Sequence, residues 1–413
     1  MTTTHPLSQM LTLPNGATLP NRIAKAAMSE ALGSVDNRVT DRLATLYRTW
    51  ARGKAGLLIT GNVMVDRRHL GEPGNVVLED RRDLHKLRAW AEAACSGGGQ
   101  VWMQLNHPGK QSPRMLNRDP VAPSAVPFRK DLRGMFATPR ALRDEEIRDI
   151  VQRFARSAAV AEAAGFQGVQ IHGAHGYLVS QFLSPHHNQR NDAWGGDAER
   201  RRAFVEAIYH AIREATSPSF CVGIKLNSAD FQRGGFTEAE SLAVISRLAE
   251  LGIDLVEISG GSYESPAMAN GGEVKASTRA REAYFLSFAE TVRQTVSVPL
   301  MVTGGFRSSE GMNQAIASGA TDLVGLARPL VLEPELPQRL LAGESVTSLV
   351  KPVTTGIRKV DEMAMMEVSW YTRQLARMGR GKPPRTQDRG LLSLLEVLAV
   401  MAGQGARSRL RAG

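Results

Sequence analysis

Short apolar runs alternate with amphipathic stretches along most of this chain. Eight runs are rich in Val, Ile and Leu and are continuous rather than alternating, which predicts strands buried on both faces. These runs lie at residues 22–28, 56–65, 100–105, 168–173, 221–226, 254–261, 299–305 and 322–330. Helical patterns separate them, at residues 41–52, 80–96, 144–164, 197–216, 237–251, 283–296, 308–318 and 333–341.

Eight strand–helix units in one chain predict a (β/α)8 TIM barrel over residues 1–345. Helix boundaries support the units: Thr237–Glu240 is a capping box, and Ser308 and Ser309 open the seventh helix. Residues 11–22 read as a hairpin that caps the barrel bottom. A doubly wound open sheet is the alternative, but no G-x-G-x-x-G follows an early strand.

Composition narrows the class of protein. The chain has 413 residues, 42% hydrophobic and 22% charged, which is ordinary for a globular protein. Its two cysteines, Cys95 and Cys221, cannot build a disulfide framework, a zinc ribbon or an iron–sulfur cluster. The first ten residues lack a signal-peptide pattern, and no run reaches the roughly 20 apolar residues of a membrane span. We therefore expect a cytoplasmic protein.

The formal net charge of +10 raises the question of nucleic-acid binding. Residues 377–413 carry eight Lys/Arg and two Asp/Glu, so the rest of the chain carries only +4. Without a basic stripe interleaved with aromatics in the main body, we expect no nucleic-acid partner.

Residues 346–413 leave the barrel pattern and form a predicted C-terminal extension. Helices are expected at 361–377 and 390–403, followed by the basic segment RSRLR. The second helix is too short to span a bilayer. It packs on the barrel or on a subunit partner in a homo-oligomer, lies on a membrane surface, or belongs to a disordered tail.

Polar residues at the ends of the predicted strands are the candidates for chemistry, because barrel active sites lie at that edge. The glycines at 304 and 305 and Arg328, which ends the GLAR segment, predict a phosphate site, since backbone N–H groups and a guanidinium bind anions. Plain turns and a surface ion pair are the alternative. Lys225 ends an apolar strand and needs an anionic partner, either a ligand or a neighbouring carboxylate. Gln104 ends the third strand and offers an amide.

His172, His175 and Tyr177 follow the fourth strand in the segment HGAHGYLVSQFLSP. Three interpretations compete: a metal site, core histidines without function, and two imidazole N–H donors that face one oxygen. No nearby carboxylate or thiol completes a metal set. Two N–H donors would stabilise charge on a carbonyl or nitro oxygen, and a phenol can deliver a proton to carbon.

This segment and its continuation HHNQRNDAWGG resemble the old yellow enzyme family of FMN-dependent ene-reductases, also described as NADH:flavin oxidoreductases. NRIAKAAMSE, GLLITGNVMVD, WMQLNHPGKQ, VGIKLNSADF, VTGGFRS and GLARPL resemble its other landmarks, in the same order. The resemblance covers roughly residues 8–345. It implies FMN as cofactor, NADH or NADPH as electron donor, and a small-molecule substrate with an activated alkene.

The resemblance also implies a role for each strand-end residue. Tyr177 would protonate the α-carbon, while His172 and His175 would bind the electron-withdrawing oxygen of the substrate. The residues implied in contact with the flavin or its phosphate are Ala27, Met28, Ser29, Asn62, Gln104, His172, Lys225, Gly304, Gly305, Ala327 and Arg328.

The chain departs from its relatives at two pocket positions. Ala31 stands where some members have a tyrosine, and Asn106 stands where some have a bulky aromatic, which suggests a roomier substrate site. The four-cysteine motif of larger relatives is absent, so electrons would come directly from NAD(P)H. A flavin amine dehydrogenase or demethylase, and a flavin-binding redox protein with little turnover, are the alternative functions.

Overall fold

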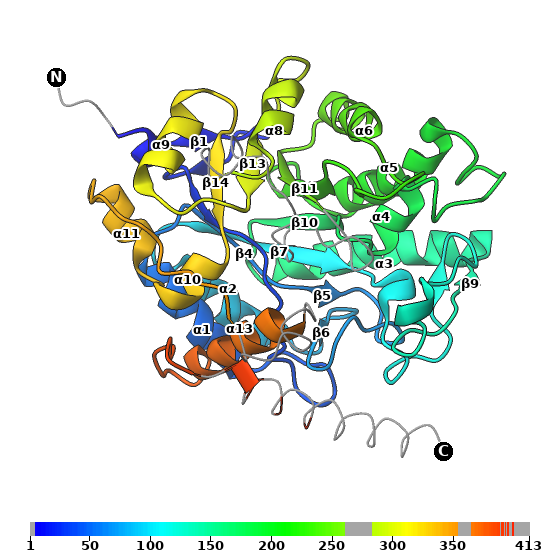
Figure 1. Ribbon diagram of the computed structural model, residues 1–413, viewed down its shortest axis with the longest axis horizontal. Coiled ribbons are helices and arrows are strands. Elements are labelled where there is room, and N and C mark those ends of the chain that lie inside the picture. Colours follow the sequence, from blue (N-terminus) through cyan, green and yellow to red (C-terminus); the bar gives the residue numbers. More distant parts are fainter. Residues whose placement is uncertain are drawn as a thin grey trace.

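The computed structural model describes residues 5–260, 283–353 and 365–388, with a few single positions between 390 and 399. Eight parallel strands close into a barrel, with helices packed around them (Figure 1). The strands run β3 (Ile23–Lys25), β4 (Leu57–Ile59), β7 (Gln100–Asn106), β10 (Gly168–Gly173), β11 (Cys221–Asn227), β12 (Leu255–Ser259), β13 (Leu300–Thr303) and β14 (Leu323–Leu326). Pairing of β10 with β7 and of β14 with β3 completes the ring and confirms the predicted (β/α)8 fold.

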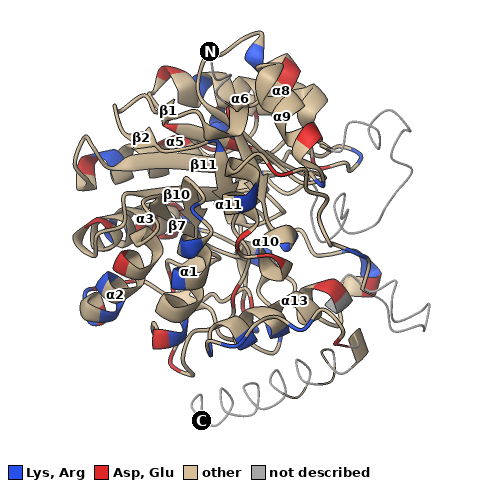
Figure 2. Cartoon of the chain, turned by 90° about the vertical axis from the view of Figure 1, so that its left-hand side faces the viewer, with Lys and Arg blue, Asp and Glu red and all other residues tan. Residues whose placement is uncertain are grey.

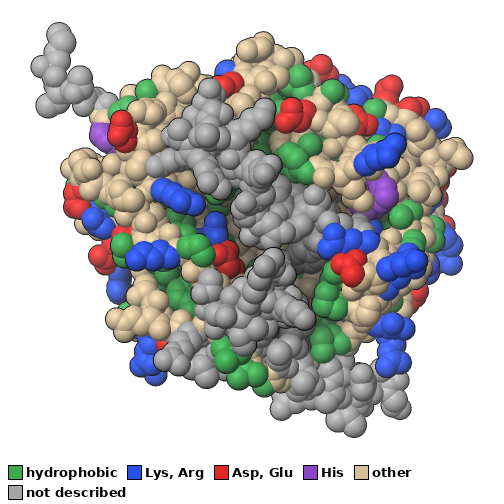
Figure 3. Space-filling model, viewed as in Figure 1, with side chains coloured by type: hydrophobic (Ala, Val, Ile, Leu, Met, Phe, Trp, Pro, Cys, Tyr) green, Lys and Arg blue, Asp and Glu red, His purple; other side chains and the backbone are tan. Residues whose placement is uncertain are grey.

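The outer helices follow the predicted positions. They are α1 (Asp41–Arg52), α2 (Leu84–Cys95), α3 (Asp144–Ala163), α5 (Ala198–Ala215), α6 (Glu238–Glu250), α8 (Leu286–Arg293), α9 (Ser309–Ala317) and α11 (Leu336–Leu341). The Thr237 side chain accepts from the Glu240 N–H, and the Thr237 N–H donates to the Glu240 carboxylate, so the predicted capping box opens α6. Charges of both signs are interspersed over the helices rather than gathered in one stripe (Figures 2 and 3).

The barrel interior is filled from below by the hairpin β1 (Leu11–Thr12) and β2 (Thr18–Leu19). Leu11, Leu13 and Leu19 pack in one cluster with the inward side chains of the barrel strands, among them Trp102. Asn15 in the turn bonds the Ser219 carbonyl (3.0 Å), just before β11. The hairpin therefore caps the N-terminal ends of the strands, as predicted.

Three predicted strands differ from the observed ones. The 56–65 run divides into β4 and β5 (Val63–Met64), and β5 pairs with β7 and with β6 (Val76–Val77). The 22–28 run ends at Lys25. The 322–330 run ends at Leu326, because Pro329 has no N–H for a ladder and is favoured in a first helical turn. There the chain forms α10 (Arg328–Leu332).

Additional short elements lie in the loops. These are α4 (Leu178–Leu183), the strands β8 (Val121–Ala122) and β9 (Arg140–Ala141), and the 3-10 turns η1 (Pro6–Ser8), η2 (Gly109–Gln111) and η3 (Lys130–Leu132). Beyond the barrel, α13 (Met365–Met378) overlaps the predicted helix at 361–377 and packs against α1 and α10. The predicted helix at 390–403 lies almost wholly outside the described residues. In the described part of the chain, no helix has the length and apolar character needed to cross a membrane.

Candidate active site

The three aromatic side chains of the HGAHGY segment meet at the C-terminal end of β10. The ring centroids of His172 and Tyr177 are 4.7 Å apart, and those of His172 and His175 are 5.2 Å apart, with near-perpendicular planes in both pairs. His172 is 4% exposed and Tyr177 is 7% exposed. The structure therefore brings the three predicted catalytic residues together in one place.

The loop that carries these rings is held by its neighbours. His175 has a left-handed backbone (φ +60°), and its N–H donates to the Asn227 side chain (3.1 Å) at the end of β11. Its Nε2 lies 2.8 Å from the Ser259 hydroxyl at the end of β12. Gln111, from the turn after β7, donates to the His175 carbonyl (2.9 Å). Contacts from the ends of β11 and β12 and from the turn after β7 therefore fix the loop.

Both imidazoles are neutral near pH 7. Burial holds the pKa of His172 well below its ordinary value, and the neighbouring His175 and Lys225 add to the effect. Burial, and then Lys225, lowers the pKa of His175 to about 3. The Ala174 N–H donates to His172 Nδ1 (3.3 Å), so the ring hydrogen of His172 is on Nε2. His172 is therefore a single N–H donor without a charge.

Lys225 lies on β11 directly beside His172 on β10. Its Nζ forms an ion pair with Glu257 on β12 (2.9 Å), and the two residues are 3% and 0% exposed. Of the two partners considered for Lys225, a ligand and a neighbouring carboxylate, the structure shows the carboxylate. Gln170 donates to the other Glu257 oxygen (2.7 Å), and Gln104 donates to Gln170 (2.7 Å). A continuous polar layer therefore crosses the barrel from β7 to β11.

Gln170 and Glu257 escaped the sequence analysis. Each interrupts an apolar strand, in GVQIHG and DLVEIS, and a polar residue within a doubly buried strand is the signal that could have identified them.

Buried side-chain oxygens without a hydrogen-bond partner in the described residues mark where a ligand could bind. Ser29 Oγ follows β3, Asn106 Oδ1 ends β7, and Thr303 Oγ1 ends β13. Unsatisfied buried polar atoms are rare in folded proteins, so three at the same end of one barrel indicate a missing polar partner. Asn62, after β4, accepts from the Asn106 amide (3.3 Å) and extends this polar rim.

The residues expected to bind phosphate lie after β13 and β14. Gly304 and Gly305 have φ of +108° and +95°, a backbone conformation that glycine adopts without strain. Ala327 precedes α10, and Arg328 is its first residue. The Arg328 guanidinium pairs with Glu367 of α13 (2.7 Å). The glycines therefore fit a backbone anion site, whereas Arg328 forms the ion pair that was the alternative to phosphate binding.

A second group of ligand-type side chains, Asp66, His69 and His107, lies in the loops after β5 and β7, with ligand atoms within 4.8 Å of one another. We call it the loop cluster. Asn117 donates to His69 Nδ1 (2.9 Å), and the backbone N–H two residues after His107 donates to its Nδ1 (3.1 Å). Both Nε2 atoms therefore carry hydrogen and have no lone pair for a metal. Asp66 is already bound by Arg68 (2.6 Å), so the cluster favours hydrogen bonding over metal binding.

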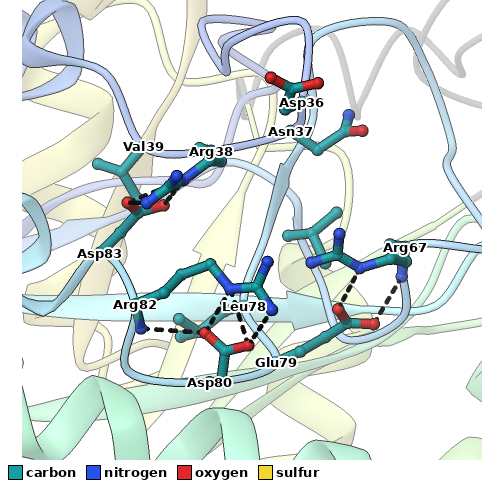
Figure 4. A pocket seen from close by; sticks show the side chains of 11 residues that line it. Asp36, Asn37, Arg38, Val39, Arg67, Leu78, Glu79, Asp80, Arg82 and Asp83 are labelled. Carbon is teal, nitrogen blue, oxygen red and sulfur yellow. Dashed lines mark hydrogen bonds and ion pairs between the residues drawn. The ribbon is translucent and has the colours of Figure 1, made fainter.

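A small surface hollow near the start of α2 contains none of the strand-end side chains (Figure 4). Most charged side chains of its lining form ion pairs: Arg82 with Asp80, Arg67 with Glu79, and Arg38 with Asp83. Since these charges neutralise one another, the hollow offers little to a charged ligand.

Comparison with known proteins gives a consistent result. Residues 7–345 match the sequence profile described as the NADH:flavin oxidoreductase / NADH oxidase family. The chain is 40% identical over 371 residues to the NADH-dependent flavin oxidoreductase iliE of Neonectria sp., covering 84% of this chain and 47% of the relative. It is 38% identical over 361 residues to iliE of Hypocrea jecorina, covering 81% of this chain and 89% of the relative. The solved structure of morphinone reductase superposes with a TM-score of 0.70 at 25% identity, over 85% of this chain and 93% of that one.

Proposed function

We propose a reaction for this chain from one premise, which is that it belongs to the NADH:flavin oxidoreductase / NADH oxidase family, the old yellow enzyme family. It is an FMN-dependent oxidoreductase that uses NADH or NADPH as electron donor and acts on a small molecule. We infer that its substrates are alkenes conjugated to a carbonyl or nitro group. The observation that carries this inference is the cluster of His172, His175 and Tyr177 at the end of β10.

The proposed cofactor site lies along the C-terminal ends of the strands. Ala27, Met28 and Ser29 would support and contact the ring, with Asn62, Gln104, His172 and Lys225 around it. Gly304, Gly305 and Ala327 would hold the phosphate with their backbone, and Arg328 would join them only by leaving its ion pair with Glu367. The oxygens of Ser29, after β3, and Thr303, at the end of β13, support this arrangement because they have no hydrogen-bond partner among the described residues and a polar cofactor would supply one. Bound there, FMN would supply hydride-transfer chemistry between NAD(P)H and the β-carbon of the alkene.

His172 and His175 bind and orient the electron-withdrawing oxygen of the substrate. Because both rings are neutral, they stabilise developing negative charge by donating N–H bonds without giving up a proton. Withdrawal of electron density through the oxygen makes the β-carbon electrophilic. The same contact therefore orients and activates the alkene.

Tyr177 is the proton donor in this proposal. Its backbone caps α4, which fixes the ring beside His172 within the buried end of β10. A phenol with a free pKa of about 10 keeps its proton at pH 7 and can transfer it to a carbanion-like α-carbon. Proton and hydride then reach adjacent carbons in one site.

The test is a Tyr177→Phe variant of the FMN-loaded protein. Anaerobic NAD(P)H should bleach the yellow colour at the wild-type rate, and reoxidation by cyclohexenone should slow by about 10²- to 10⁴-fold, as expected for loss of general acid catalysis. Tyr209→Phe is a matched control, because that hydroxyl bonds the Leu251 carbonyl (2.8 Å) between two outer elements. Normal reoxidation of the Tyr177 variant would refute the proton-donor role. No reoxidation of wild-type protein by any enone or nitroalkene would refute the substrate class.

A further inference from the structure

A fully buried lysine lies between the barrel and α1. Lys25 is 0% exposed, and its Nζ donates to the carbonyls of Ile59 (2.7 Å) and Ala26 (3.2 Å). The same nitrogen lies 4.5 Å from the ring centroid of Trp50 and 5.4 Å from that of Tyr47, both on α1. The ammonium thus ties the end of β3 to the end of β4, with two aromatic faces over it.

A buried carboxylate makes the second link. Glu30, which is 6% exposed, accepts from the Tyr47 hydroxyl (2.5 Å) and from the Gly61 N–H (2.8 Å). Both partners donate to the same carboxylate oxygen, Oε1. Trp50 on the same helix donates its indole N–H to the Leu330 carbonyl of α10 (2.8 Å). We call Lys25, Glu30, Tyr47 and Trp50 the α1 network.

The bonds of this network begin where the sheet ladder stops. The β3–β4 ladder ends at the pair Lys25–Leu58. Past that pair the two chain segments leave the ladder but stay close, since a Cβ on Gly61 would lie 2.1 Å from the Met28 carbonyl oxygen. They carry Ala27, Met28 and Ser29 on one side and Asn62 on the other. Lys25 and Glu30, on the β3 segment, bond the Ile59 carbonyl and the Gly61 N–H on the β4 segment. Both side chains also contact Tyr47 on α1. The bond from Trp50 to Leu330 attaches α10 to the same helix.

Packing alone is a poor explanation for this arrangement. A buried ammonium has lost its hydration, and replacement of buried charges by apolar side chains of similar volume is often neutral or stabilising. Burial lowers the pKa of Lys25 to about 8, although Glu30 acts in the opposite direction. The charges at 25 and 30 hold defined backbone atoms rather than simply fill space.

We propose that Lys25 and Glu30 are positioning residues that hold the β3, β4 and α10 segments in the arrangement that binds FMN. The proposal rests on the cofactor-binding residues assigned above. Neither side chain touches the reacting atoms in this account. Their effect is to fix the segments that follow β3 and β4, together with α10, and to place a buried positive and a buried negative charge behind the FMN site.

The test compares FMN affinity and flavin midpoint potential in Lys25→Met, Glu30→Gln and Arg22→Met proteins. Arg22 precedes the same strand at its opposite end, where it pairs with Asp322 (3.6 Å), so its loss removes one positive charge far from the network. Both network variants should bind FMN about tenfold or more weakly in titrations of the FMN-free protein. The potential should become more negative for Lys25→Met and more positive for Glu30→Gln, while Arg22→Met should leave both values near wild type.

Opposite shifts in midpoint potential distinguish the proposed role from a general loss of structure. A general loss of structure would shift the potential of both variants in the same direction. Glu30→Gln is nearly isosteric and keeps the test valid should Lys25→Met fold poorly. Wild-type affinity and potential in both network variants, or an equal effect from Arg22→Met, would overturn the proposal. Enone reduction is measured separately in wild-type protein. If wild-type protein does not reduce enones, the proposed reaction fails, but FMN affinity and midpoint potential still test the role of the α1 network.

Discussion

The buried ion pair between Lys225 and Glu257 yields a prediction with both a magnitude and a sign. The two side chains are 3% and 0% exposed, and their charged atoms are 2.9 Å apart. A Lys225→Met substitution would leave a carboxylate inside the barrel with Gln170 as its one polar side-chain partner among the described residues. Breaking a buried pair from one side costs about 3–5 kcal/mol, so the free energy of unfolding should fall by that amount. Lys225→Met/Glu257→Gln should recover most of the loss, because no unpaired charge remains.

The single variants Lys225→Met and Glu257→Gln should move the flavin midpoint potential in opposite directions. Loss of the lysine disfavours the anionic reduced flavin, whereas loss of the carboxylate favours it, and each tenfold change in relative stability corresponds to about 30 mV for a two-electron couple. Urea denaturation of the FMN-free protein measures the first effect, and anaerobic redox titration measures the second. Arg213→Met is the control, since it breaks a pair with Asp254 before β12 and should lower stability without changing the potential. Equal losses from the single and double variants, or equal potentials in both singles, would refute the reasoning.

Three further predictions follow from the strand ends and the loops. The pKa of His172 is lower in the folded than in the unfolded protein, so its contribution to stability is complete above pH about 6.5 and declines as the pH falls below that value. The free energy of unfolding should therefore depend less on pH between 7 and 5 in His172→Asn than in wild type. Gly325→Ala would place a Cβ 2.0 Å from Thr303 Oγ1, whereas Gly134→Ala meets nothing within 4 Å, so only the first should weaken FMN binding in a fluorescence titration. Elemental analysis of protein purified without chelator should find no stoichiometric metal, and EDTA should leave the melting temperature unchanged. A bound metal, or a lower melting temperature with EDTA, would show that the loop cluster binds metal.

The fold was predictable from the sequence because the barrel strands are mostly apolar runs buried on both faces, and because helices such as α6 and α9 begin at capping residues. The elements that sequence reasoning missed are short: α4 has six residues and α10 has five. Such helices cover too few turns to show a period. The strand predicted at 322–330 was wrong after Leu326, since the apolar residues around Pro329 continue the pattern of a strand while the proline ends it.

The site was less predictable than the fold. His172, His175 and Tyr177 could be found because they stand close together in sequence at a strand end, and the structure brings them together. The partner of Lys225 lies 32 positions away on the next strand, so only the strand register makes Glu257 its neighbour. The pairing of Arg328 with Glu367 could not be predicted from the sequence either, because it depends on how α13 packs against the barrel.

The leucine-lined hairpin beneath the barrel has a consequence for the order of events in turnover. With the base filled by Leu11, Leu13 and Leu19, passage through the barrel axis is blocked, and molecules must arrive and leave at the C-terminal ends of the strands. Under the proposed reaction, a nicotinamide and an alkene would meet the flavin from this one side and would have to take turns. Steady-state rates plotted against either reactant should accordingly give parallel double-reciprocal lines, with each reactant at high concentration competing against the other.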